Sequence, residues 1–301
     1  FIRPKSAWVF DSYTEGGVWQ AHDGSAAKAT LERAGWSVRL DDAPNATDAQ
    51  WRGAAAEIID PGVIMVTTMG NSDFFDLGKG NRCAPGDLPM LDRPAMLHFV
   101  HSWSLLAPTK PDTIGARWFD RGVYAYAGSI QEPFLSAFVP TPLVAERLAS
   151  GEPWGVVPRV EGAAPWRVAV FGDPLITSGP TSAITRDAGA KLPLEGVSDL
   201  AEGLKDAIGE RDFARAIRLM TLLARDEDAE RLLAAIVASP DASLAPEAAA
   251  YAITPAFRSG DLGLLIRVQQ SMAGEDAKSP RALDPLWNLT RQRLNGLEKD
   301  S

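Results

Sequence analysis

The chain has 301 residues, of which 46% are hydrophobic, and a formal net charge of −9. This length suggests one large or two ordinary domains, and the apolar content is ample for a buried core. The acidic charge is spread along the chain without a basic patch, which argues against a nucleic-acid partner. Its apolar runs fall short of the roughly 20 residues of a membrane span, so we expect no transmembrane segment.

The single cysteine, Cys83, excludes an internal disulfide and fits a reducing compartment. The chain starts at Phe1 rather than Met and shows no signal peptide. We therefore expect it to be a fragment or a processed form of a longer polypeptide.

Strand and helix patterns alternate over residues 1–180. The apolar, β-branched segments predict strands at 7–13, 36–42, 62–68, 95–103, 123–130 and 166–174. Helical periodicity with capping residues, Ser25 and Thr47 among them, predicts helices at 25–35, 47–59, 113–122 and 141–151. This alternation indicates an α/β fold with a mostly parallel sheet in three layers. Residues 71–94, rich in Gly and Pro, are expected to form a loop or a lid.

Helix-forming residues dominate residues 195–301, where strand patterns disappear. They predict helices at 199–208, 212–225, 228–238, 246–257, 262–273 and 283–297. A short similarity between DFARAIRLM at Asp212 and DLGLLIRVQ at Asp261 suggests an all-α helical-hairpin or solenoid-like module. A non-repetitive helical bundle is an equal alternative. This region is the candidate surface for protein interaction and for assembly into oligomers.

Polar side chains follow several predicted strands at their carboxyl ends, where ligands collect in an open parallel sheet. The strand that ends in His101 and Ser102 is the most conspicuous of them. The candidate site residues at this edge are His101, Ser102, Met69, Gly70, Glu132 and Asp73, with Cys83 in the adjoining loop. The edge is also expected to hold Asp11, Ser12, Asp41, Asp42 and Asp173.

A serine hydrolase could be assembled from Ser102, from His101 or His98 as base, and from Glu132 or Asp73. However, adjacent residues of a strand point to opposite faces, so His101 and Ser102 diverge unless the strand has already ended. His98 on an apolar strand is more typical of a core histidine, and Cys83 of a bystander. The sequence shows no zinc, calcium or phosphate-loop spacing, so we expect no cofactor and no metal.

The order of these strand ends resembles the caspase-like peptidases of the gingipain type. The resemblance covers Val63 to Ile176 and rests on GVIMVTTMGNSDFF, AMLHFVHSWSL, GVYAYAGSIQEPFLSAF and WRVAVFGDPLI. In that family a His before Gly is the general base, and a Cys at the tip of the next strand is the nucleophile. Here Met69 precedes Gly70, and His101-Ser102 occupies the tip of the next strand.

The resemblance thus implies the fold without the peptidase chemistry, because methionine accepts no proton at neutral pH. It predicts a caspase-like α/β domain over residues 1–180, followed by the helical module over residues 195–301. We expect a non-catalytic peptidase-like protein that binds or scaffolds a protein or peptide partner. Two alternatives stay open: a hydrolase with a rearranged Ser/Cys–His site, and a structural assembly subunit.

Overall fold

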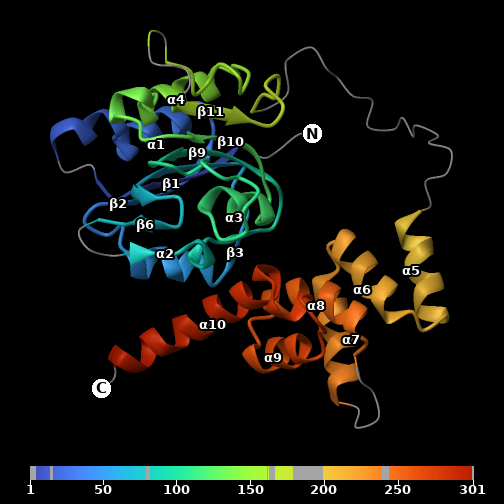
Figure 1. Cartoon of the computed structure of the whole chain (residues 1–301). Helices are drawn as coiled ribbons and strands as arrows, with labels where there is room; N and C mark the ends of the chain where they lie inside the picture. The colour runs from blue at the N-terminus through green and yellow to red at the C-terminus, as the bar shows by residue number, and fades with distance from the viewer. Residues whose placement is uncertain are drawn as a thin grey trace. The chain divides into compact units, whose positions relative to one another are not determined.

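A computed structural model describes residues 5–13, 16–78, 82–160, 162, 167–178, 199–238 and 244–299. The chain divides into two compact units, Phe1–Thr185 and Arg186–Ser301 (Figure 1).

The N-terminal unit is built on a six-stranded sheet with the strand order β11-β10-β9-β4-β1-β2. Its strands are β1 Ser6–Asp11, β2 Ser37–Asp42, β4 Val63–Thr67, β9 Ala95–Val100, β10 Val123–Ser129 and β11 Val168–Phe171. The pairings from β2 to β10 are parallel, whereas β11 pairs with β10 in the antiparallel sense. The expected mostly parallel α/β sheet is therefore confirmed.

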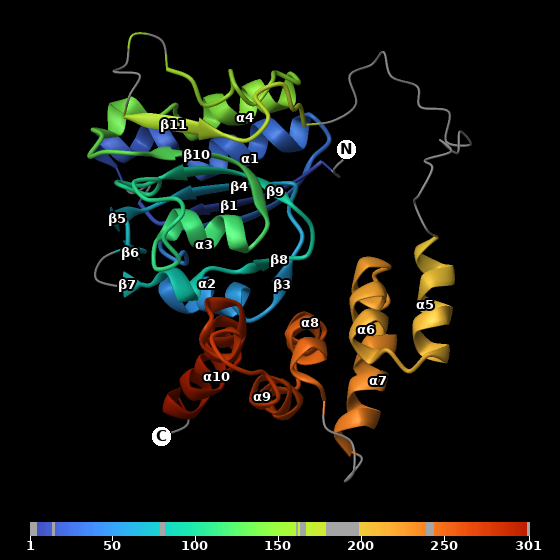
Figure 2. The same cartoon turned by 45° about the vertical axis from the view of Figure 1, so that its right-hand side comes forward.

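Helices cover both faces of this sheet (Figure 2). Helices α1 Gly24–Arg33 and α4 Thr141–Ala149 pack with Val9, Met65 and Met96 on one face. Helices α2 Asp48–Ala55 and α3 Ile114–Asp120 pack with Phe10, Ile64 and Phe99 on the other. Because both faces are covered, every residue of β4 and β9 is buried, as their continuous apolar sequences require.

The N-termini of α1 and α2 are capped by side chains. Thr47 caps α2 as predicted, since its hydroxyl accepts from Gln50 N at 3.3 Å. The prediction of Ser25 as the cap of α1 is wrong, because the Asp23 carboxylate accepts from Ser25 N at 2.8 Å and Ala26 N at 3.3 Å. A carboxylate at this position also interacts favourably with the helix dipole.

Replacing Asp23 with Ala is expected to lower the free energy of unfolding of the N-terminal unit by about 1 kcal/mol, because the cap of α1 is lost. Urea unfolding followed by tryptophan fluorescence measures this change. Ser25→Ala is the control and should cost clearly less. Equal losses in the two variants would contradict the assignment of the cap.

Two predicted segments fold differently from expectation. Helix α2 ends at Ala55, and Ile58–Ile59 form the short strand β3, which pairs with β8 Met90–Leu91. The predicted loop or lid contains an antiparallel sheet of β5 Met69–Asn71, β6 Phe74–Asp76 and β7 Arg82–Cys83.

The lid prediction is wrong for the described part of residues 71–94, because this segment contributes to the core. Phe75, Leu77 and Leu88 are fully buried in the cluster around Trp51. The Phe75 and Trp51 ring centroids lie 5.3 Å apart in an edge arrangement. Single apolar residues scattered along a segment do not indicate such a core contact in the sequence. The Gly and Pro residues of the same segment suggest a loop.

The second unit is helical, as expected. It contains α5 Leu200–Gly209, α6 Phe213–Leu222, α7 Asp226–Ala238, α8 Pro246–Arg258, α9 Leu262–Gln270 and α10 Pro280–Lys299. The main contacts join helices that are neighbours or next neighbours along the chain, such as α6 with α7 and α8. Among the described residues of both units, no helix combines the length and the apolar character needed to cross a bilayer.

Candidate functional site

The carboxyl ends of β4 and β9 form the centre of the candidate site. These strands are neighbours, with Thr67 paired to Val100. The chain then continues into Met69-Gly70 after β4 and into His101-Ser102 after β9. The segments Met69-Gly70 and His101-Ser102 therefore follow neighbouring strand ends.

His101 turns inward from the end of β9 and is almost completely buried. Its Nδ1 lies 2.9 Å from the Thr68 hydroxyl, and its Nε2 lies 2.8 Å from the Asn71 carbonyl oxygen. The carbonyl can only accept, so Nε2 carries the proton and Nδ1 accepts from Thr68. Both ring nitrogens are thus occupied by the chain itself, and burial lowers the pKa of His101 to about 4.

Gly70 lies against the imidazole of His101. Its φ of 152° lies in the region that favours glycine. A Cβ at this position would lie 2.7 Å from His101 Cε1 and 2.4 Å from the Phe74 carbonyl oxygen. Glycine is therefore required at position 70 for this close packing, independently of which residue stands at position 69.

Ser102 points away from His101 and hydrogen-bonds to Glu132. Its hydroxyl donates to Glu132 Oε1 at 3.0 Å, and the indole of Trp103 donates to Glu132 Oε2 at 2.8 Å. Trp103 adopts a φ of 61°, which marks a tight turn directly after the strand. Among the described residues, no histidine shares a hydrogen bond with the Ser102 hydroxyl.

The strand ends at Val100, so alternation along a strand is not what separates His101 from Ser102. Instead, the Ser129 hydroxyl at the end of β10 donates to the His101 carbonyl oxygen at 2.6 Å. This bond fixes the backbone between the two side chains. His101 is directed toward the β5 segment, whereas Ser102 is directed toward the segment after β10.

Arg167, just before β11, is a residue of this edge that sequence reasoning missed. Its Nη1 donates to the Glu132 carbonyl oxygen at 2.5 Å, and its backbone oxygen accepts from Ile130 N. Asp173, by contrast, does not lie at this edge. Because β11 is antiparallel, its far end lies beside Tyr124 and Ala125 near the start of β10. The antiparallel direction of β11 places Arg167 at this edge of the sheet and Asp173 at the opposite edge. The sequence does not show this direction.

The remaining candidates do not join a catalytic arrangement. The Cys83 side chain is buried in the core beside Phe75. Met69 is 44% exposed, and Asp73 is exposed. Because its side chain is buried, Cys83 is not placed to reach a substrate as a nucleophile.

His98 and His22 are core histidines on the face covered by α1 and α4. Neither ring nitrogen of His98 has a hydrogen-bond partner among the described residues. Burial, with a contribution from His22, lowers the pKa of His98 to about 3. Burial also lowers the pKa of His22 to about 4, and its Nδ1 lies 3.3 Å from the Thr141 hydroxyl. These residues are neutral at pH 7 and contribute to packing.

Asp11 is a buried carboxyl at the end of β1. Its Oδ2 accepts from Gly24 N at 2.8 Å, at the start of α1. Burial outweighs this bond and, together with the charges of Asp23 and Asp42, raises the pKa of Asp11 to about 6. Within the described ranges, no group of three or more acidic, histidine or cysteine side chains is arranged to hold a metal ion.

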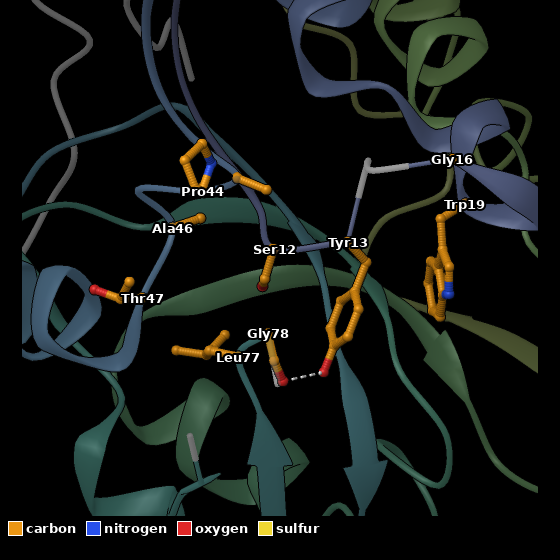
Figure 3. A pocket seen from close by; sticks show the side chains of 10 residues that line it. Ser12, Tyr13, Gly16, Trp19, Pro44, Ala46, Thr47, Leu77 and Gly78 are labelled. Carbon is orange, nitrogen blue, oxygen red and sulfur yellow. Dashed lines mark hydrogen bonds between the residues drawn. The ribbon is translucent and has the colours of Figure 1, made fainter. Parts of the chain in front are cut away.

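A pocket of about 410 Å³ lies at the same edge of the sheet, beyond the ends of β1 and β2 (Figure 3). Its lining residues are Ser12, Tyr13, Gly16, Trp19, Ala43, Pro44, Ala46, Thr47, Leu77 and Gly78. Of these, only Ser12 was among the sequence candidates. The other residues come from the segment after β1, from the 3-10 helix Gly17–His22, from the segment between β2 and α2, and from the two residues that follow β6. Only the tertiary structure brings these segments together.

Comparisons of the chain with protein-family models, with curated proteins and with solved structures find no match.

Proposed function

We propose that the N-terminal unit is a caspase-like α/β domain that binds a protein or peptide partner without cleaving it. The observation that carries this proposal is the environment of His101. Its two ring nitrogens are bonded to Thr68 and Asn71, and it is buried beside Phe99, with ring centroids 5.1 Å apart. A general base needs a nitrogen that reaches the nucleophile or the substrate, and this imidazole offers none.

The position before Gly70 supports the same conclusion. Met69, which stands where the resembling family has its base, is 44% exposed at the site and has no proton-accepting group. The neighbouring strand end carries no thiol, and Cys83 is buried elsewhere. Binding of a partner needs only the surface at this edge of the sheet. The absence of the family's base and thiol does not remove that surface.

The helical unit supports a role in interaction. Its helices contact mainly their first and second neighbours along the chain, which is typical of stacked helical hairpins. We therefore propose a helical-hairpin module that provides a contact surface. Mass measurement in solution tests self-association through this unit, and a monomer at high concentration would argue against it.

A peptidase assay tests the proposed loss of catalysis. The purified protein, given peptides with Arg, Lys or Asp at the scissile bond, is expected to show no cleavage above that of Ser102→Ala and Glu132→Gln. Ser102 is half-buried and Glu132 is exposed, so both variants should keep the far-ultraviolet circular dichroism spectrum of the parent. Cleavage by the parent that disappears in Ser102→Ala would overturn the proposal.

Such a result would favour the second candidate, a hydrolase in which Glu132 acts directly on Ser102. The 3.0 Å bond between Ser102 Oγ and Glu132 Oε1 is the observation in its favour. As a class, carboxylates are weaker bases than imidazole by about two pKa units, so this pair is a poor substitute for a Ser–His pair.

A further inference from the structure

The pocket beyond β1 and β2 occupies a favourable place in the topology. Strand β1 has β2 on one side and β4 on the other, so the chain reverses its direction of winding there. In open α/β sheets, ligands bind at the carboxyl ends of the strands beside such a reversal. Ser12, directly after β1, donates from its hydroxyl to the Thr67 carbonyl oxygen at 3.1 Å and ties the ends of β1 and β4 together.

Two stacked aromatic rings form one wall of the pocket. The ring centroids of Tyr13 and Trp19 lie 5.0 Å apart with an interplanar angle of 26°. The Tyr13 hydroxyl donates to the carbonyl oxygens of Asp76 at 2.9 Å and Gly78 at 3.1 Å. Figure 3 shows these rings on one side of the pocket, opposite Pro44, Ala46 and Thr47. The Tyr13 ring is therefore held in place by its own hydrogen bonds before any ligand arrives.

None of the described residues that line the pocket carries a charged side chain. An ion in the pocket would lose hydration without gaining a partner of opposite charge from the lining, which is costly. Anions face a further penalty, because Asp42 adjoins the lining residue Ala43. Burial, with a contribution from the charge of Asp76, raises the pKa of Tyr13 to about 12. The Asp76 carboxylate is already paired with Arg82, whose Nε lies 3.0 Å from Asp76 Oδ1. A cation therefore gains little from Asp76.

We propose that this pocket binds a flat, uncharged aromatic ring. Its volume of about 410 Å³ lies in the range of small-ligand sites, which have apolar, aromatic walls and few polar groups. A ring that enters the pocket gains contact with aromatic and aliphatic side chains, and the Ser12 and Thr47 hydroxyls supply polar contacts at its edge. The ring could belong to a small molecule or to a side chain of a peptide. The proposal holds whether or not the Ser102 region is catalytic.

Three probes with the same ring and different charges test it: benzamide, benzamidinium and benzoate. Ligand-observed NMR at roughly millimolar concentrations is suited to fragments of this size. We expect benzamide to bind, and benzamidinium and benzoate to bind at least about tenfold more weakly. Tighter binding of benzamidinium or of benzoate, or no binding of benzamide, would overturn the proposal.

Variants of the aromatic wall locate the binding. Trp19→Ala is expected to weaken benzamide binding about tenfold, whereas Trp19→Phe keeps a ring and most of the affinity. Trp287→Ala, a matched loss of a partly exposed indole in the helical unit, should change nothing. Ala43→Phe fills the pocket from the β2 side while Trp19 stays in place, and should abolish binding. Binding that survives both Trp19→Ala and Ala43→Phe would place the ring elsewhere.

A capped tripeptide with a central Phe distinguishes the two sources of the ring. If the peptide binds about tenfold more tightly than benzamide, the ring belongs to a peptide, and the backbone adds contacts. Equal or weaker binding of the peptide, with benzamide binding retained, indicates a free small molecule. Both results support the ring site, and both are independent of any peptidase activity.

Discussion

Acidification from about pH 7.5 to about pH 5 is expected to lower the free energy of unfolding of the N-terminal unit by several kcal/mol. The cause is the neutral burial of the chain's three histidines, His22, His98 and His101. Burial lowers their pKa values to about 4, about 3 and about 4, respectively. In the unfolded chain a histidine titrates near pH 6.5.

The sign follows from proton binding. Between about pH 6.5 and about pH 4 the unfolded chain binds up to one proton per histidine that the folded unit does not bind. The stabilisation is therefore complete above about pH 6.5 and is lost as the pH falls toward the folded values. Asp11 acts in the opposite direction, because its raised pKa of about 6 lets the folded unit bind a proton first. The net difference of about two protons corresponds to roughly 2–3 kcal/mol per pH unit.

Urea unfolding at several pH values, followed by tryptophan fluorescence, measures this effect. Eight of the nine tryptophans lie before residue 186, so the signal reports mainly on the N-terminal unit. His98→Leu is the informative variant, because His98 makes no hydrogen bond among the described residues and Leu suits its apolar surroundings. It should reduce the pH dependence by about one proton. An unfolding midpoint that does not change between about pH 7.5 and about pH 5 would contradict the neutral burial of the histidines.

Replacing Gly70 with Ala is expected to have the other large effect, a loss of roughly 2–6 kcal/mol in the free energy of unfolding. The added Cβ would approach the Phe74 carbonyl oxygen to 2.4 Å and His101 Cε1 to 2.7 Å. The φ of 152° adds strain for any residue with a side chain. Relief requires movement of backbone in β6 or of His101, which is held by two hydrogen bonds.

Gly53→Ala is the matched control for this substitution. Gly53 lies inside α2, and a Cβ there would meet no atom within 4 Å. The control should be neutral or more stable by about 0.5–1 kcal/mol, because alanine is the better helix former. Thermal and urea unfolding of both variants check the pair. If Gly70→Ala were as stable as Gly53→Ala, the close packing of His101 against β5 would be wrong.

Much of the architecture was predictable from local sequence. The continuous apolar runs of β4 and β9 indicated central strands covered on both faces, and both are fully buried. Helices α5 to α10 of the second unit lie within a few residues of their predicted positions. Such patterns are readable because periodicity and capping depend on neighbours within a few residues. The cap of α1 was misplaced by two residues for the same reason, since Ser25 and Asp23 are both good caps.

The candidate site was predictable in part. The sequence placed His101, Ser102 and Glu132 at the carboxyl edge of the sheet, and Ser102 and Glu132 do meet there. It left open whether His101 and Ser102 diverge, because their directions depend on Ser129, Thr68 and Asn71 from three other segments. Arg167 lies at this edge of the sheet and Asp173 does not, because β11 is antiparallel to β10.

The sequence by itself indicated the buried central strands, where most strands and helices lie, and that Met69, directly before Gly70, has no proton-accepting group. Only the tertiary structure decided that the imidazole of His101 is used up by hydrogen bonds, that residues 71–94 contribute to the core, and that Tyr13 and Trp19 form a pocket wall. The physical reason is range. Burial and secondary structure follow from short patterns along the chain, whereas the partner of a side chain depends on which distant segments the sheet brings together.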